Sequence, residues 1–172
     1  MSNQTKKIAN MAMLVAVAMI FSYVESLIPI NFGVPGMKLG IANLVTVTGL
    51  YFLAVPEMMA VVAMRVLLTG FLFGNGMSII YSLAGGLLSV LVMAGMKKLK
   101  GFSIIGISMA GGIAHNIGQL AVATLVVESL KLVYYLPALL AAGAVTGFLI
   151  GLVSGKLLPV VKREAVKSLK TV

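Results

Sequence analysis

Long uncharged apolar runs alternate with short polar or glycine-containing breaks along most of this chain. A helix needs about 17–25 mostly apolar residues to cross the hydrocarbon core of a bilayer. Six segments meet that length, so the pattern predicts a bundle of six transmembrane helices. Their approximate ranges are 8–29, 38–54, 56–74, 77–96, 103–127 and 136–158.

The breaks between these segments carry turn and helix-start signals. Pro35 and Gly36 lie in the first break, and the sequence GNG at 74–76 is typical of a tight turn. Pro56 and Pro137 suit the first turns of the third and sixth helices. A signal peptide is an alternative for the first segment, but its apolar run exceeds 20 residues and no small-residue cleavage site follows.

Composition agrees with a membrane-embedded, all-α protein. The 172 residues are 60% hydrophobic and 10% charged, against about 45–50% apolar and 25% charged residues in soluble domains. One small water-soluble core cannot bury so much apolar surface, whereas lipid-facing helices can expose it. We therefore expect residues 1–172 to form a single, multi-pass transmembrane domain.

The net charge of +9 is distributed unevenly between the two sides of the predicted bundle. One side holds only Lys38 and Lys131, and Arg65 lies inside a helix. Cytoplasmic loops are enriched in Lys and Arg, so both termini are predicted to be cytoplasmic, with a basic tail over 159–172. Topology and contact with lipid headgroups account for the charge, and no nucleic-acid partner is expected. The cations of the cytoplasmic side are Lys6, Lys7, Lys97, Lys98, Lys100, Lys156, Lys162, Arg163, Lys167 and Lys170.

The sequence offers no basis for metal, thiol or nucleotide chemistry. The chain has no Cys and no Asp, and its one His and four Glu show no metal-ligand spacing. It also lacks a GxxxxGK[ST] phosphate loop. We therefore expect no metal site, no cofactor and no catalytic residue, and a protein that is not an enzyme.

Polar side chains interrupt the predicted helices near their middle and outer parts. An ionisable group in the bilayer costs about 2.5–3.5 kcal/mol on insertion scales and usually faces the bundle interior or a cavity. His115, Asn116 and Gln119 also share one helix face, because their spacings are i,i+3 and i,i+4. The pattern predicts a ligand cavity open to the outside. Its candidate residues are Glu25, Lys38, Asn43, Arg65, Asn75, Tyr81, His115, Asn116 and Gln119.

Structural roles are the alternatives for the same residues. Arg65 either contacts a ligand or pairs with Glu25, and His115 either contacts a ligand or joins two helices, as polar groups in membranes often do. Asn75 and Tyr81 line the rim of the cavity, or they are a plain turn and an interfacial aromatic.

Charge and loop composition bear on the ligand. Lys38 and Arg65 outnumber Glu25, which favours a small anionic or amphipathic molecule. The Gly- and Pro-containing stretch NFGVPG at 31–36 is a candidate external loop that closes over the site.

Small residues recur every four positions on two helices, a spacing that lets helix backbones approach closely. Glycines repeat in this way from Gly143 to Gly155, where internal packing is the expected role. Ala12 and Ala16 lie near the cytoplasmic end of the first helix, where the alternative is contact with a partner.

Several longer motifs occur in order along the chain: SYVESLIPI, GMKLGIANLVT, RVLLTGFLFGN, YSLAGGLLSVLVM and GGIAHNIGQL. Together they resemble the bacterial membrane family called heptaprenyl diphosphate synthase component I, or Gx transporter family, over about residues 8–158. That family is similar to the S components of energy-coupling factor (ECF) transporters. The resemblance implies a six-helix S-component fold in the bacterial cytoplasmic membrane.

S components bind a vitamin or metal ion and assemble with a transmembrane T component and two ATPases. The resemblance therefore implies a substrate-binding S component of an ECF-type importer. In S components an AxxxA motif on the first helix docks on the T component, and Ala12 and Ala16 match this motif. The loop after the first helix gates the substrate, which corresponds to residues 31–37.

Two other functions stay open. The family name implies a membrane subunit in prenyl diphosphate or quinone biosynthesis. Such a subunit would be noncatalytic, because the chain has no Asp-rich motif to hold magnesium on a diphosphate. A stand-alone carrier, with His115 or Glu25 relaying protons, is the other alternative.

Overall fold

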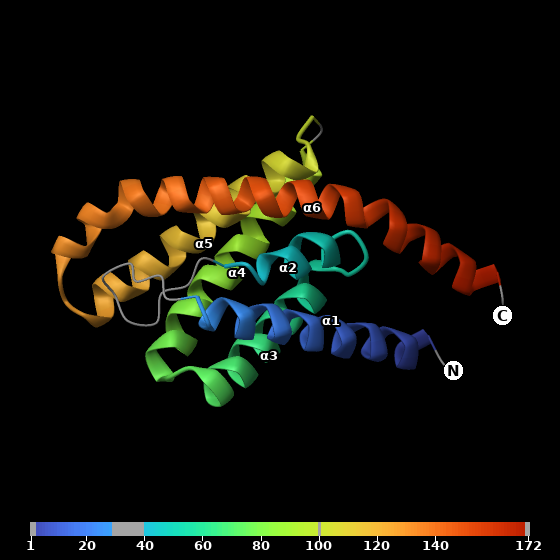
Figure 1. Cartoon of the computed structure of the whole chain (residues 1–172), viewed down its shortest axis with the longest axis horizontal. Coiled ribbons are helices and arrows are strands. Elements are labelled where there is room, and N and C mark those ends of the chain that lie inside the picture. Colours follow the sequence, from blue (N-terminus) through green and yellow to red (C-terminus); the bar gives the residue numbers. More distant parts are fainter. Residues whose placement is uncertain (1–2, 29–39, 100, 171–172) are drawn as a thin grey trace.

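The computed structural model describes residues 3–28, 40–99 and 101–170, and this part of the chain contains helices and no strands. The long helices pack side by side, and both chain termini lie toward the same end of the molecule (Figure 1). The elements are α1 (Asn3–Ser26), α2 (Asn43–Gly49), α3 (Val55–Phe73), α4 (Gly76–Lys98), α5 (Ile104–Val126), the 3-10 helix η1 (Leu130–Tyr135) and α6 (Leu136–Lys170).

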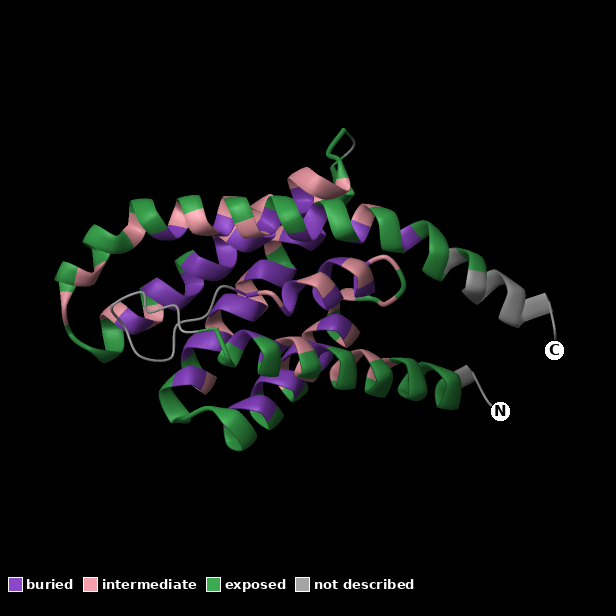
Figure 2. Cartoon of the chain, in the orientation of Figure 1, coloured by how far each residue is buried: buried purple, intermediate pink, exposed green. Residues whose placement is uncertain are grey.

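Within these residues, five helices are long and apolar enough to cross a membrane. The helices α3, α4 and α5 begin and end within two residues of the segments expected at 56–74, 77–96 and 103–127. Figure 2 shows buried residues concentrated between the helices, with exposed residues on the outward faces of α1 and α6. The exposed faces carry large apolar side chains such as Phe71 and Leu125, as a surface facing lipid requires.

The segment expected to span the membrane over 38–54 is different in its described part. There the structure has only α2, whose seven residues rise about 10 Å, against about 30 Å for the hydrocarbon core. Turns precede it from Gly40 and follow it to Leu53. The expectation of a full spanning helix is therefore wrong for residues 40–54. Their apolar character reflects burial among the other helices, since most of α2 is buried.

The C-terminal part of the chain also differs from the expected one. The sixth helix was expected to end near residue 158, but α6 continues through Pro159 to Lys170. The described part of the basic segment 159–172 is thus helical.

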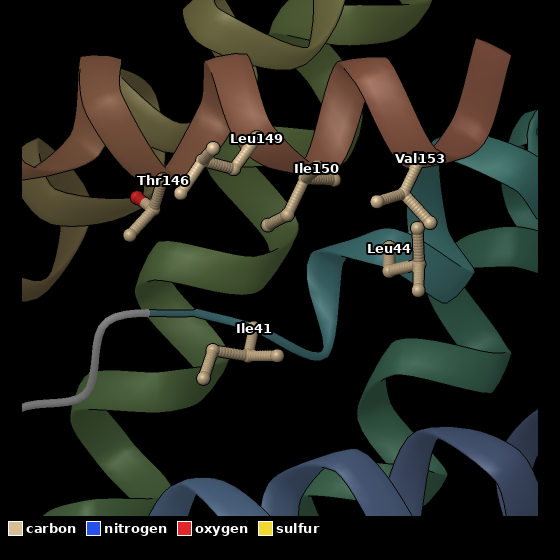
Figure 3. Close-up of a pocket in the computed structure, with 6 residues that line it drawn as sticks. All are labelled: Ile41, Leu44, Thr146, Leu149, Ile150 and Val153. Carbon is tan, nitrogen blue, oxygen red and sulfur yellow. The ribbon is translucent and has the colours of Figure 1, made fainter. Parts of the chain in front are cut away.

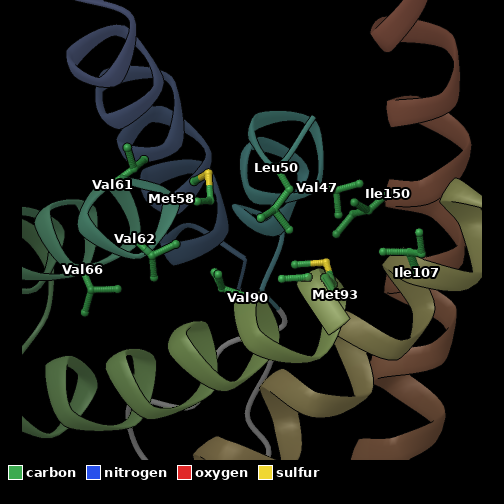
Figure 4. Packing of buried hydrophobic residues seen from close by; sticks show 11 residues of the cluster. Val47, Leu50, Met58, Val61, Val62, Val66, Val90, Met93, Ile107 and Ile150 are labelled. Carbon is green, nitrogen blue, oxygen red and sulfur yellow. The ribbon is translucent and has the colours of Figure 1, made fainter. Parts of the chain in front are cut away.

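The main apolar core lies toward the end of the bundle that carries both termini. It joins the first half of α3 to the second half of α4, with contributions from α2, α5 and α6 (Figure 4). A smaller apolar cluster near the other end joins α4, α5 and α6. The main core consists of Val47, Leu50, Met58, Val61, Val62, Val66, Val90, Met93, Ala94, Ile107 and Ile150, and the smaller cluster of Tyr81, Leu120, Ala123 and Leu139.

Close backbone packing joins α5 to α6, as the glycine repeat predicts. A Cβ atom added at Gly147 would lie 2.6 Å from the Cα atom of Met109, and one added at Gly151 would lie 2.7 Å from the Cα atom of Ile105. Larger residues do not fit there unless the backbones separate. Gly155 differs, because an added Cβ atom there meets nothing within 4 Å.

Two lysine side chains link neighbouring helices at the end of the bundle where both termini lie. Lys7 forms an ion pair with Glu57, whose carboxylate also accepts a hydrogen bond from the Ala54 backbone N–H at 3.1 Å. Lys97 donates to the Leu50 carbonyl oxygen beyond α2, and its Nζ lies 4.7 Å from the ring centre of Tyr51. These contacts therefore link α1 to α3, and α4 to the segment that follows α2.

Candidate functional site

A layer of buried polar side chains crosses the bundle between the two apolar clusters. Five different helices contribute to it, and every member is less than a tenth exposed. Charged and amide groups in such a position are costly without partners. We call this set the polar layer: Ser22 and Glu25 of α1, Asn43 and Thr46 of α2, Arg65 and Thr69 of α3, Ser82 of α4, and His115, Asn116 and Gln119 of α5.

Glu25 joins the end of α1 to the turn before α2. Its Oε1 accepts a hydrogen bond from the Gly40 backbone N–H at 2.6 Å, and its Oε2 accepts one from the Ile41 N–H at 3.2 Å. Hydrogen bonds to an ionised group are stronger than neutral ones. Glu25 thus places the start of α2 in the middle of the bundle.

Arg65 is 5% exposed and faces both α1 and α4. Its Nη1 donates to the Ser22 hydroxyl at 3.1 Å, and Glu25 attracts its charge. Its Nη2 is buried without a hydrogen-bond partner among the described residues, on the side toward Gly86. Arg65 therefore interacts with α1 through Nη1, while its Nη2 lies unpaired beside α4 in the described part of the chain.

His115 lies between the turn before α2 and the middle of α4. A Cβ atom added at Gly40 would lie 3.1 Å from the His115 Cδ2, and one added at Gly85 would lie 3.1 Å from its Nδ1. At Gly40 the imidazole leaves little room for a side chain, and at Gly85 an added Cβ atom would also lie 2.6 Å from the His115 backbone carbonyl oxygen. Gly40 has a second reason, since its φ of +85° is in the left-handed region.

Three carboxamides beside His115 have unused hydrogen-bonding capacity. Both polar atoms of Asn43 and of Gln119 are buried without a partner in the described part of the chain. Asn116 donates from Nδ2 to the Leu139 carbonyl oxygen at 2.7 Å, which joins α5 to α6, while its Oδ1 has no such partner there. Buried polar atoms are normally paired with protein, water or ligand, so these atoms make the polar layer a candidate binding position.

Some residues predicted for the site lie elsewhere or are not described. Asn75 is exposed and caps α4, where its Oδ1 accepts from the Ser78 N–H at 2.8 Å. Tyr81 is 1% exposed and packs in the smaller apolar cluster, so it is neither at the rim nor interfacial. Lys38 and the loop at 31–37 lie outside the described residues.

Sequence reasoning missed Ser22, Gly40, Gly85 and Gly86 as neighbours of the site. Ser22 precedes Glu25 by three residues in an apolar run, so the two side chains share one helix face. This spacing could have predicted that Ser22 lies near the site. The paired glycines of the YSLAGG motif are a signal for the close approach of α4 to His115 and Arg65.

Two apolar grooves lie outside the polar layer. One, of about 290 Å³, separates α2 from α6; side chains of α6 project toward Ile41 and Leu44 (Figure 3). Its full lining is Ile41, Leu44, Thr146, Leu149, Ile150 and Val153. The other, of about 200 Å³, lies between α1 and α3 and is lined by Ile8, Met11, Ala12, Val15, Ala60, Val61 and Met64.

A solved structure shares this arrangement of helices. It is described as the structure and mechanism of the S component of a bacterial ECF transporter. The two chains superpose with a TM-score of 0.60 over 98% of this chain and 99% of the other, at 19% sequence identity. At that identity the likeness shows the fold: the chain has the fold of an ECF S component.

The search of curated proteins gives no match. The family model for heptaprenyl diphosphate synthase component I matches residues 14–157, which include every described residue of the polar layer. A match over most of the length, together with the shared fold, identifies the family. The chain belongs to the heptaprenyl diphosphate synthase component I family and has the fold of an ECF transporter S component.

Proposed function

We propose that this protein is the substrate-binding S component of an ECF-type importer, and that the polar layer holds its small-molecule ligand. The observation that carries the proposal is the set of buried, unpartnered polar atoms of Asn43, Arg65 and Gln119 among the described residues. These atoms come from three helices: Asn43 and Gln119 lie beside His115, and Nη2 of Arg65 lies toward Gly86 of α4. A bound molecule supplies the partners that they lack.

The ligand of this proposal is a small amphipathic or anionic nutrient. Within the described part of the polar layer, the charge of Arg65 is balanced by that of Glu25, so any excess of positive charge depends on Lys38. The apolar groove between α2 and α6 begins at Ile41, whose N–H is bonded to Glu25. This proximity of apolar and polar surfaces favours an amphipathic molecule.

Assembly with a T component and ATPases forms the second part of the proposal. Ala12 and Ala16 are exposed on α1, and Ala12 lines the groove between α1 and α3. Small exposed residues four apart let a partner helix approach closely. The chain has no phosphate loop of its own, so its partners supply ATP hydrolysis.

Native mass spectrometry of the gently purified protein tests ligand binding. We expect a small molecule to be released on activation from the wild type and to be absent from Arg65→Gln. Arg65→Lys, which keeps the charge but has fewer donors, should retain part of the signal. An unchanged ligand signal from a folded Arg65→Gln protein would reduce Arg65 to a structural role.

Co-purification tests the docking surface. Ala12→Leu combined with Ala16→Leu should prevent recovery of the T component and ATPases while leaving ligand binding unchanged. The matched control is Ala121→Leu combined with Ala141→Leu, two exposed alanines on α5 and α6. Normal recovery of the complex with the α1 double variant would exclude the proposed surface.

A second candidate function follows from the family description. It is a noncatalytic membrane subunit associated with prenyl diphosphate or quinone biosynthesis, and the apolar groove beside the polar layer would suit a prenyl chain. The two functions differ in their partners. Recovery of a soluble prenyl synthase, and of no ATPase, would favour the second.

A further inference from the structure

From the unpaired donors and acceptors of the polar layer, we infer the chemical class of the ligand. The group that the site recognises is a neutral amide-type edge: a lactam, imide, urea or primary carboxamide, with an N–H donor beside a C=O acceptor. This inference rests on the proposed function, because it assumes that the polar layer is the ligand site.

The first observation is that two carboxamides have no hydrogen-bond partner on either polar atom among the described residues. Asn43 is 3% exposed and Gln119 is 0% exposed. On each side chain both the amide nitrogen and the carbonyl oxygen are buried and without a partner within the described residues. A single group can pair with both atoms of a carboxamide only if that group also has a donor and an acceptor. Asn and Gln recognise the edge of adenine in DNA in this way.

The second observation is that the two carboxamides flank one imidazole. The position of a Cβ atom added at Gly40 is 3.1 Å from Asn43 Nδ2 and 3.3 Å from His115 Nε2. The corresponding position at Gly85 is 2.8 Å from Gln119 Cγ and 3.1 Å from His115 Nδ1. Asn43 therefore lies near the Nε2 side of the ring, and the Gln119 side chain lies near its Nδ1 side.

Hydrogen-bond matching distinguishes this edge from charged groups. A carboxylate accepts hydrogen bonds only, so it would leave the oxygens of Asn43, Asn116 and Gln119 without donors. An ammonium group donates only, so it would leave the amide nitrogens without acceptors. An amide edge offers a donor beside an acceptor, so it can satisfy both polar atoms of one carboxamide at once.

The carboxylate of Glu25 does not change this balance. Its two oxygens accept the backbone N–H groups of Gly40 and Ile41, and its charge offsets that of Arg65. The charge that remains for recognition in the described part of the layer is thus close to zero, which matches a neutral polar edge.

Ligand-observed NMR on the full-length protein in lipid nanodiscs tests the inference with defined probes. The probes are nicotinamide, its carboxylate analogue nicotinate, its N,N-dimethyl derivative, uracil and 1,3-dimethyluracil. We expect nicotinamide or uracil to bind saturably, and the N-methylated partner to bind at least about tenfold more weakly, because a site built around a hydrogen bond rejects an analogue that lacks it.

Two variants and one control connect the binding to the carboxamides. Gln119→Met and Asn43→Leu remove the donor and acceptor at nearly constant size, and each should weaken binding by at least about tenfold. Ser154→Ala is the control, since Ser154 is also buried with an unpartnered hydroxyl among the described residues but lies on α6 outside the polar layer. Monodisperse elution and an unchanged helical circular dichroism spectrum establish that the variants fold.

Tighter binding of nicotinate than of nicotinamide, equal binding of the methylated compounds, or no binding of any amide probe would each overturn the inference. Recovery of the ATPase complex separates this outcome from failure of the proposed function. A complex that assembles while the amide probes fail leaves the S-component role intact and rejects only the ligand class. A protein with neither a released ligand nor ATPase partners fails both.

Discussion

The Glu25 carboxylate accepts the Gly40 backbone N–H at 2.6 Å across a separation of fifteen residues. This bond links the last turn of α1 to the turn that precedes α2, and it places Gly40 against His115. Arg65 is connected to the same end of α1, because its Nη1 donates a hydrogen bond to the Ser22 hydroxyl. The geometry of the site thus depends on a single buried carboxylate.

Glu25→Gln should destabilise the protein strongly. The substitution removes the charge that offsets that of Arg65 and replaces one of the two oxygens that accept the Gly40 and Ile41 N–H groups, and a hydrogen bond to a charged group contributes about 1.5–3 kcal/mol. We predict a clear loss of thermal stability in detergent, together with loss of ligand from the purified protein. A melting temperature equal to that of the wild type would show that the interactions of the Glu25 carboxylate contribute little to stability.

The double variant Glu25→Gln with Arg65→Gln provides the matching control. It removes both charges, so the two losses should be less than additive, with a coupling of about 0.5–3 kcal/mol for groups of one network. Strictly additive losses would mean that the two side chains act independently.

Gly147→Leu should disrupt the packing of α5 against α6, whereas Gly155→Leu should not. A side chain at Gly147 meets the backbone of Met109 and the Ser108 carbonyl oxygen at 2.7 Å, and backbone atoms cannot move aside as side chains can. We predict a loss of about 1–3 kcal/mol, as for other overpacked sites. Thermal melting of the two variants measures the difference, and equal melting temperatures would contradict it.

Lys97→Met should loosen the segment that follows α2. It removes the hydrogen bond to the Leu50 carbonyl oxygen and the cation above the Tyr51 ring, which together contribute about 1–2 kcal/mol. Hydrogen exchange of residues 44–53, followed by mass spectrometry, should become faster. Lys98→Met changes the charge equally on a neighbouring exposed residue and should leave that exchange unchanged.

The orientation of the chain can be tested because the protein has no native cysteine, so any introduced cysteine is the only thiol. We predict that Lys131→Cys, just before α6, reacts with a membrane-impermeant maleimide in intact cells. Gln4→Cys, near the start of α1, should react only after permeabilisation. The reverse labelling pattern would place both termini outside the cell.

Much of the helical architecture could be predicted from hydropathy alone. The helices α3, α4 and α5 are uninterrupted apolar runs of spanning length, and caps such as Asn75 and Ser103 lie at their starts. The short α2 could not be predicted in this way, because hydropathy does not distinguish burial against lipid from burial against protein. The helix η1 was missed for a related reason, since its residues continue the apolar run of α6 without a break.

The polar residues of the site were easier to predict than their contacts. Glu25, Asn43, Arg65, His115, Asn116 and Gln119 stand out because a membrane rarely tolerates such groups, and the structure buries all six. The proximity of Asn43 to His115 depends on Gly40 and on the bond to Glu25, which no spacing along the chain shows. Tyr81 was misplaced because aromatic residues near helix ends are as typical of interfaces as of cores.

The proposed binding of a ligand to the unsatisfied amides of the polar layer has a consequence for the lifetime of the protein in a cell. A molecule that binds only the folded chain adds about 2.7 kcal/mol of stability at a hundred times its dissociation constant. Membrane quality control removes chains in proportion to their unfolded fraction, and this stabilisation lowers that fraction about a hundredfold. The proposed function therefore predicts that the abundance of the protein follows the supply of its ligand without any change in transcription.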